Sequence, residues 1–196
     1  MNENDIISAV KTFAIQSSEQ DDIHGFGHVE RVYNMCVQIG KKLKANLFVL
    51  KISALLHDIG RIYEKNDPLK RNHAEISAEM ALEYLKSSNI EISQEDINNI
   101  VHCIKAHSFS NNIPPITLEA KILSDNDKLD ATGAVGLYRT IGFTVKNEGG
   151  IYEIIEHLEN KILKLKNLLY LDMSKEIAKK RTHVIEEFYK KIKEEK

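Results

Sequence analysis

Apolar residues recur along most of this chain with the period of an α-helix. Between His28 and Leu43 they return at intervals of three and four, which places them on one helix face. The same pattern predicts further helices over residues 2–17, 73–88, 93–104, 116–131, 150–169 and 174–194. Because no segment shows a convincing strand pattern, an all-α fold is predicted.

One segment is apolar on nearly every side. NLFVLKISALL, residues 46–56, is typical of a central buried helix, with Asn46 as its N-cap and Gly60 placed to end it. Residues 61–72 are expected to form a polar loop, and the glycine-rich residues 133–150 a mobile segment.

The length of 196 residues fits one domain. We expect a compact helical bundle over residues 1–196, with a core at about 20–145 and a helical extension at about 150–194. The two amphipathic helices of the extension either pack against the bundle or form a homodimer surface.

Composition narrows the classes of function. A net charge of −2 argues against a general nucleic-acid binder, which is usually basic. The N-terminus lacks the features of a signal peptide, and no apolar run approaches the length of a membrane span. Two cysteines are too few for a disulfide scaffold, so a soluble cytoplasmic protein with no membrane partner is expected.

His57 and Asp58 follow the buried segment directly. Adjacent helical residues point about 100° apart, yet both side chains can reach one ion beyond the helix end. Histidine and carboxylate ligands together suit Mn²⁺, Fe²⁺, Co²⁺, Zn²⁺ or Mg²⁺ rather than a structural zinc site. A buried His–Asp hydrogen bond explains the dipeptide alone equally well.

Two other segments carry candidate ligands. In HGFGHVERV, His28 begins the regular helix and is a better ligand than His24, which precedes two glycines. In SDNDKLDA, Asp125, Asp127 and Asp130 repel one another unless a cation or basic groups compensate, and a solvated acidic face is the alternative.

These segments, in this order, resemble the HD superfamily of metal-dependent phosphohydrolases. The resemblance extends to a prokaryotic branch that includes nucleotide pyrophosphohydrolases, and it covers about residues 20–192. It rests on HVERV, ALLHDIGR, HAEISAEMA, HSFS, DNDKLDATGAVGLYRT and KILKLKNLLYLDMSKEIAKKRTHVIEEFYKKI. Two residues depart from the pattern of the branch: Gly25 stands where Asp is usual, and Asn126 where Ala is usual.

The resemblance implies an HD-domain helical bundle that holds one divalent ion. The implied ligands are His28, His57, Asp58 and Asp127. Mn²⁺ is favoured, with Fe²⁺, Co²⁺, Zn²⁺, Mg²⁺ and Ni²⁺ as alternatives. The implied reaction is nucleotide hydrolysis by a metal-activated water, with nucleoside triphosphate split to monophosphate and pyrophosphate. A nucleotidase, a triphosphohydrolase or a non-catalytic nucleotide- or metal-sensing module are the alternatives.

Other residues are assigned roles around this ion. His73 and His107 match positions of further ligands in multinuclear HD proteins, and we favour phosphate contact or proton transfer for them. Negative charge on the phosphoryl oxygens needs cations, and Arg61 is the best placed of the loop residues Arg61, Lys65, Lys70 and Arg71. The predicted catalytic residues are Asp58, His107, His73 and Arg61, and the predicted substrate-binding residues are Arg61, Lys128, His24 and Arg139.

Overall fold

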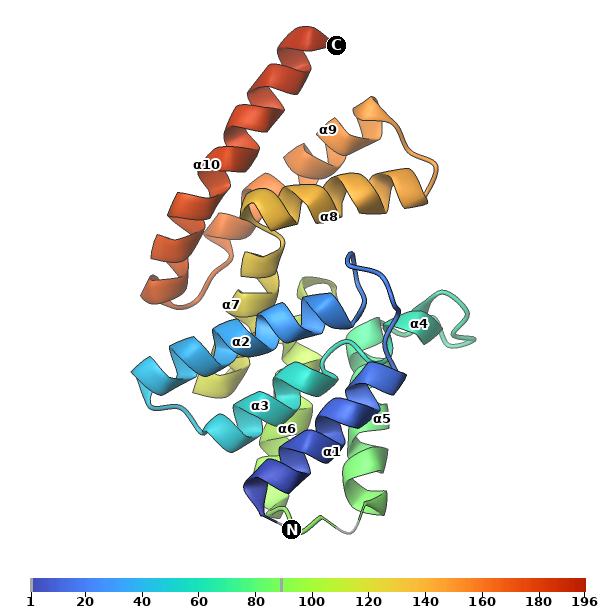
Figure 1. Ribbon diagram of the computed structural model, residues 1–196, viewed down its shortest axis with the longest axis vertical. Coiled ribbons are helices and arrows are strands. Elements are labelled where there is room, and N and C mark those ends of the chain that lie inside the picture. Colours follow the sequence, from blue (N-terminus) through green and yellow to red (C-terminus); the bar gives the residue numbers. More distant parts are fainter. Residues whose placement is uncertain (1, 89) are drawn as a thin grey trace. The chain divides into compact units, whose positions relative to one another are not determined.

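The computed structural model describes residues 2–88 and 90–196, and none of these residues lies in a β-strand. The elements are α1 (Glu3–Gln16), α2 (Phe26–Leu43), α3 (Leu47–Leu56), α4 (Arg61–Glu64), α5 (His73–Ser87), α6 (Gln94–His107), η1 (Phe109–Asn111), α7 (Leu118–Asp130), α8 (Gly133–Lys146), α9 (Ile151–Asn160), η2 (Ile162–Asn167) and α10 (Asp172–Glu195) (Figure 1). The all-α prediction is confirmed. The chain forms two compact units, Met1–Ser124 and Asp125–Lys196. Across the described ranges, no helix is both long and apolar enough to cross a lipid bilayer.

Helix α3 is the central helix of the first unit. It packs against α1, α2, α5 and α6, and seven of its ten residues are buried (Figure 1). Asn46 caps it as predicted, because its side-chain oxygen accepts the backbone N–H groups of Phe48 and Val49 at 3.1 and 3.2 Å. Packing on several sides therefore fixes the end of α3, where His57 and Asp58 follow.

The role predicted for Gly60 is wrong. Helix α3 ends at Leu56, and Gly60 is the N-cap residue of α4, with an ordinary φ of −84°. A Cβ at this position would lie 2.5 Å from the backbone nitrogen of Ser77 and 2.8 Å from the carbonyl oxygen of His73. Glycine is required here because α5 passes so close to the backbone.

The second unit contains α8, α9, η2 and α10 and has its own apolar core. Residues 133–146, expected to be mobile, form helix α8. The single helix predicted over 150–169 divides at Lys161 into α9 and η2. The 3₁₀ geometry of η2 places residues three apart on one side, so Ile162 and Leu165 both face the core. The buried members of this core are Ile154, Leu158, Ile162, Leu165 and Ile185.

Asp125 holds the start of α10 within the second unit. Its two carboxylate oxygens accept the backbone N–H groups of Tyr170 and Leu171, both at 2.9 Å. Replacing Asp125 by Ala removes both acceptors, and we expect the free energy of unfolding to fall by about 2 kcal/mol. Thermal unfolding checks this loss. Asp172→Ala, at the exposed first residue of α10, is the control and is expected to change stability by less than about 0.5 kcal/mol.

Candidate metal centre

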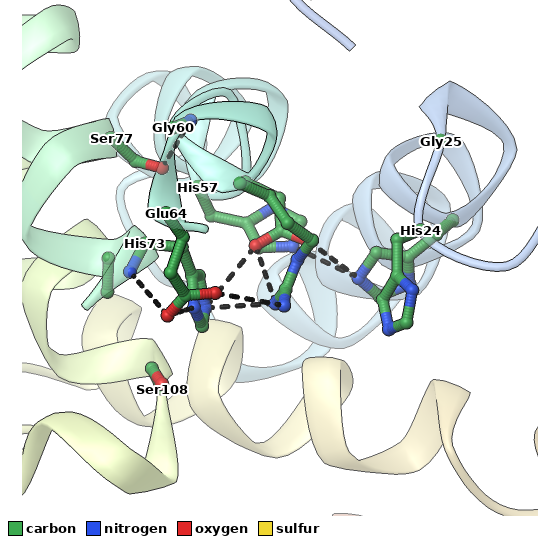
Figure 2. A network of polar contacts seen from close by, with 12 residues as sticks. His24, Gly25, His57, Gly60, Glu64, His73, Ser77 and Ser108 are labelled. Atoms are coloured by element: carbon green, nitrogen blue, oxygen red, sulfur yellow. Dashed lines mark hydrogen bonds and ion pairs between the residues drawn. The ribbon is translucent and has the colours of Figure 1, made fainter. Parts of the chain in front are cut away.

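Four histidines and one aspartate meet in the interior of the first unit. His28 comes from α2, His57 and Asp58 from the turn after α3, His73 from the start of α5, and His107 from the end of α6. All five side chains are buried. Figure 2 shows this network, with His57 and His73 labelled.

Asp58 belongs to two groups of possible ligands, one at each oxygen. In the first group, His28 Nε2 lies 3.3 Å from His57 Nε2 and 3.8 Å from Asp58 Oδ2. In the second group, Asp58 Oδ1 lies 3.5 Å from His73 Nε2 and 3.8 Å from His107 Nε2. Within each group, the three ligand atoms lie within 4.8 Å of one another.

Hydrogen bonds at Nδ1 fix the ring orientation of three histidines. A backbone carbonyl can only accept, so Nδ1–H of His57 donates to Ala54 O at 2.8 Å and Nδ1–H of His107 donates to Ile104 O at 2.6 Å. His73 Nδ1 lies 3.1 Å from Glu64 Oε1. This arrangement leaves the Nε2 lone pairs directed toward Asp58, as in histidines that bind metals.

Glu64 is a supporting residue that the sequence analysis missed. It accepts both the backbone N–H and the ring N–H of His73, at 3.0 and 3.1 Å. The hydrogen bond from the ring of His73 lowers the pKa of Glu64 to about 2. In the sequence, Glu64 is marked only by its position about one turn after Arg61, and that position does not indicate that His73, nine residues later, is its partner.

Arg61 forms a two-pronged ion pair with Asp58. Its Nε donates to Asp58 Oδ2 at 2.6 Å, and its Nη2 donates to Oδ1 at 3.0 Å. The same Nη2 lies 2.9 Å from His73 Nε2. Burial opposes ionisation of Asp58, but the charge of Arg61, with help from the nearby histidines, holds the pKa of Asp58 well below its usual value.

The other basic residues of the loop after Asp58 have different surroundings. Arg71 is held by Asp67, with Nη2 2.8 Å from Oδ1, and by Glu79 at 2.6 Å. Lys65 and Lys70 are exposed. All four cations are candidates for phosphate contact by sequence, whereas the structure places two of them, Arg61 and Arg71, in ion pairs.

His24 lies on the loop before α2, at the edge of the network in Figure 2. Asp21 orders this loop, because its Oδ1 accepts the backbone N–H groups of Ile23, His24 and Gly25 at 2.9, 2.9 and 3.2 Å. A Cβ on Gly25 would lie 2.1 Å from the carbonyl oxygen of Asp21. The close backbone at Gly25 therefore leaves no room for the Asp that is usual at this position in the branch.

Three of the residues predicted for the site lie in the second unit. Asp127 lies on α7, and its role as the fourth ligand stays a prediction. Lys128 is buried with its Nζ 5.7 Å from the Tyr170 ring centroid, and burial lowers its pKa. Arg139 Nη1 donates to Asp130 Oδ2 at 2.8 Å in a buried ion pair. Basic groups thus compensate part of the acidic SDNDKLDA segment.

The donor set of the first group fits a divalent ion. Two ligand atoms that each lie about 2.1 Å from one ion, at tetrahedral or octahedral angles, are about 3.0–3.4 Å apart. The 3.3 Å between the Nε2 atoms of His28 and His57 agrees with this spacing, and the 3.8 Å from His28 Nε2 to Asp58 Oδ2 has to shorten when an ion binds. Without an ion, the facing Nε2 atoms of His28 and His57 need a shared proton between them. His28, His57 and Asp58 can therefore hold a divalent cation, with the carboxylate supplying negative charge.

The fold and this cluster define a class of protein. A family model for the HD domain matches residues 25–132, so the chain belongs to the HD family. The family predicted from the sequence motifs is confirmed. The protein is an HD-superfamily hydrolase whose histidines and aspartate can hold a divalent metal.

Particular relatives cover nearly the whole chain. An uncharacterized protein of Bacillus subtilis, YpgQ, is 27% identical over 183 residues, which are 89% of this chain and 85% of YpgQ. A crystal structure of YpgQ in complex with ADP is 24% identical, with a TM-score of 0.78 and coverage of 100% and 97% of the two chains. A structure from Lactobacillus plantarum is 27% identical, with a TM-score of 0.80 and coverage of 96% and 95%.

A third solved structure belongs to the same superfamily. It is an HD-superfamily hydrolase from Bacillus thuringiensis, 25% identical to this chain, with a TM-score of 0.74. The similarity covers 99% of this chain and 98% of that one. The two chains thus agree over both units described above.

Proposed function

We propose that this protein is a divalent-metal-dependent phosphohydrolase that acts on nucleotides, with Mn²⁺ as the preferred ion. The favoured reaction splits a nucleoside triphosphate into monophosphate and pyrophosphate. The observation that carries the proposal is the buried group of His28, His57 and Asp58, with His73 and His107 beside it, in a chain of the HD family. The proposed substrate is a small molecule in the cytoplasm rather than nucleic acid.

A nucleotide substrate is supported by one relative and by the surroundings of His73. The YpgQ structure contains ADP, and YpgQ is similar to this chain over most of its length. In this chain, Tyr63 and Phe109 expose aromatic rings suited to stacking with a base. Tyr63 precedes Glu64, which binds His73, and Ser110 after Phe109 accepts from the Asn72 side chain at 2.8 Å.

When bound, a divalent ion supplies Lewis acidity that polarises a phosphoryl oxygen and lowers the pKa of a water. The residues of the chain supply the rest. Asp127 is the proposed fourth ligand. His107 presents its Nε2 on the Asp58 Oδ1 side and is the proposed proton donor to the leaving oxygen, and His73 is the proposed alternative once Arg61 Nη2 leaves its Nε2. His24, Lys65 and Lys70 are proposed to contact phosphate oxygens.

The experiment incubates metal-free protein with Mn²⁺ and a panel of ribo- and deoxynucleotides and measures the released products. We expect pyrophosphate and a nucleoside monophosphate, and loss of turnover when EDTA removes the ion. Released inorganic phosphate or tripolyphosphate instead would favour a nucleotidase or a triphosphohydrolase. Absence of turnover with Mn²⁺, Fe²⁺, Co²⁺, Zn²⁺, Mg²⁺ and Ni²⁺ would favour a sensing module.

A further inference from the structure

Two groups of possible ligands share Asp58, but their surroundings differ. We propose that Arg61 limits this centre to one divalent ion, because its guanidinium occupies the place that a second ion would take. The inference rests on the metal site of the proposed function and is independent of the nucleotide substrate. It assigns Arg61 a positioning role inside the centre rather than contact with substrate.

The second group is already bridged by a cation. A single nitrogen, Arg61 Nη2, lies 3.0 Å from Asp58 Oδ1 and 2.9 Å from His73 Nε2. These atoms are two of the three that the group offers, and His107 Nε2 is the third. Because the Arg61 side chain carries five donors and no acceptor, His73 Nε2 must accept in this contact, so its lone pair is already engaged.

The first group leaves more room for an ion. Arg61 Nε donates to Asp58 Oδ2 of this group at 2.6 Å. A carboxylate oxygen has two lone-pair directions, so Oδ2 keeps one for an ion between His28 and His57. His28 Nε2 lies 3.8 Å from Asp58 Oδ2 and 3.3 Å from His57 Nε2, so these three atoms surround the place for an ion.

Neighbouring groups hold Arg61 in this position. Its backbone N–H donates to Asp58 O at 3.1 Å, which keeps the two residues within one turn. Glu64, three residues later, binds His73 through Oε1 and places Oε2 3.9 Å from Arg61 Nη1. A second ion must displace Arg61 Nη2 from Asp58 Oδ1 and from His73 Nε2, and it leaves the guanidinium close to a new double positive charge.

Ion stoichiometry tests the inference without any measurement of turnover. Equilibrium dialysis against Mn²⁺, with metal counted by mass spectrometry, is expected to give about one ion per wild-type chain. Arg61→Ala is expected to raise the count to about two, because Asp58 Oδ1, His73 and His107 become available together. The double variant Arg61→Ala/His73→Ala is expected to return to about one.

Arg71→Ala is the matched control. Arg71 lies in the same loop and also forms a two-pronged pair with an aspartate, Asp67, which is outside the cluster. Its removal is expected to leave one ion per chain. If Arg61→Ala does not give the circular dichroism spectrum of a folded protein, Arg61→Gln replaces it, since glutamine removes the charge but fills much of the space.

The outcomes separate the inference from the proposed function. Two ions in the wild type, or one ion in folded Arg61→Ala or Arg61→Gln, would overturn the role of Arg61 and leave the metal site intact. No bound ion in the wild type would overturn the metal site itself. One ion in the wild type and two in the Arg61 variant, reversed by removal of His73, would establish the inference.

Discussion

Replacing Asp58 by Asn is expected to abolish both Mn²⁺ binding and turnover. One oxygen of this buried carboxylate belongs to each of the two groups of possible ligands, so loss of its charge affects both groups. The amide keeps the shape of the side chain but removes its negative charge. Mutation of residues that only support ligands lowers metal affinity about 10–100-fold, and loss of a ligand at the centre should cost at least about 100-fold.

Isothermal titration with Mn²⁺ and the nucleotide assay measure this effect. Asp67→Asn is a matched control, because Asp67 has a buried side chain that pairs with Arg71 but lies outside the cluster. We expect Asp67→Asn to bind Mn²⁺ with the affinity of the wild type. If Asp58→Asn also retained that affinity while folded, the assignment of the metal centre would be wrong.

Replacing Gly60 by Ala is expected to destabilise the first unit by about 3 kcal/mol. The new Cβ would lie 2.5 Å from Ser77 N and 2.8 Å from both His73 O and Ile76 Cβ. Two of these neighbours are backbone atoms of α5, so the helix itself must shift. That shift also strains the 2.8 Å hydrogen bond from Gly60 N–H to Ser77 Oγ and moves His73 relative to Asp58.

Chemical denaturation with and without Mn²⁺ measures both consequences. Gly27→Ala serves as the comparison, because its Cβ would meet the flexible Asp22 side chain at 3.1 Å rather than backbone. In a helix, that exchange also favours alanine, so a change of less than about 1 kcal/mol is expected. Equal losses in the two variants would show that the approach of α5 is not tight.

The sequence predicted the elements whose local signals agree with their packing. Asn46 has both a capping side chain and a uniformly apolar helix after it, and both features appear in the structure. The glycines of residues 133–150 suggested mobility, but Gly136 is buried within a helix, and a Cβ there would lie 2.2 Å from the carbonyl carbon of Ala131. Tertiary packing overrides the low helix propensity of glycine there, and a propensity argument cannot detect it.

Local pattern was also insufficient for the polar contacts of the site. The dipeptide His57–Asp58 marked a metal site or a buried hydrogen bond, and the ordered motifs of the HD family favoured the former. The partner of Arg61 was not predictable, because a charged residue after a ligand faces either solvent or the ligand. Only the fold shows that Arg61 turns back onto Asp58 and reaches His73, twelve residues away.

The segment from Asp58 to Glu64 is not expected to tolerate an insertion or a deletion. Three residues spaced three apart, Asp58, Arg61 and Glu64, all contact His73. One inserted residue would rotate everything after it by about 100° and separate Arg61 from Asp58 and Glu64 from His73 together. Changes in chain length on this side of the centre are therefore confined to residues 65–70, beyond Glu64 and before Arg71.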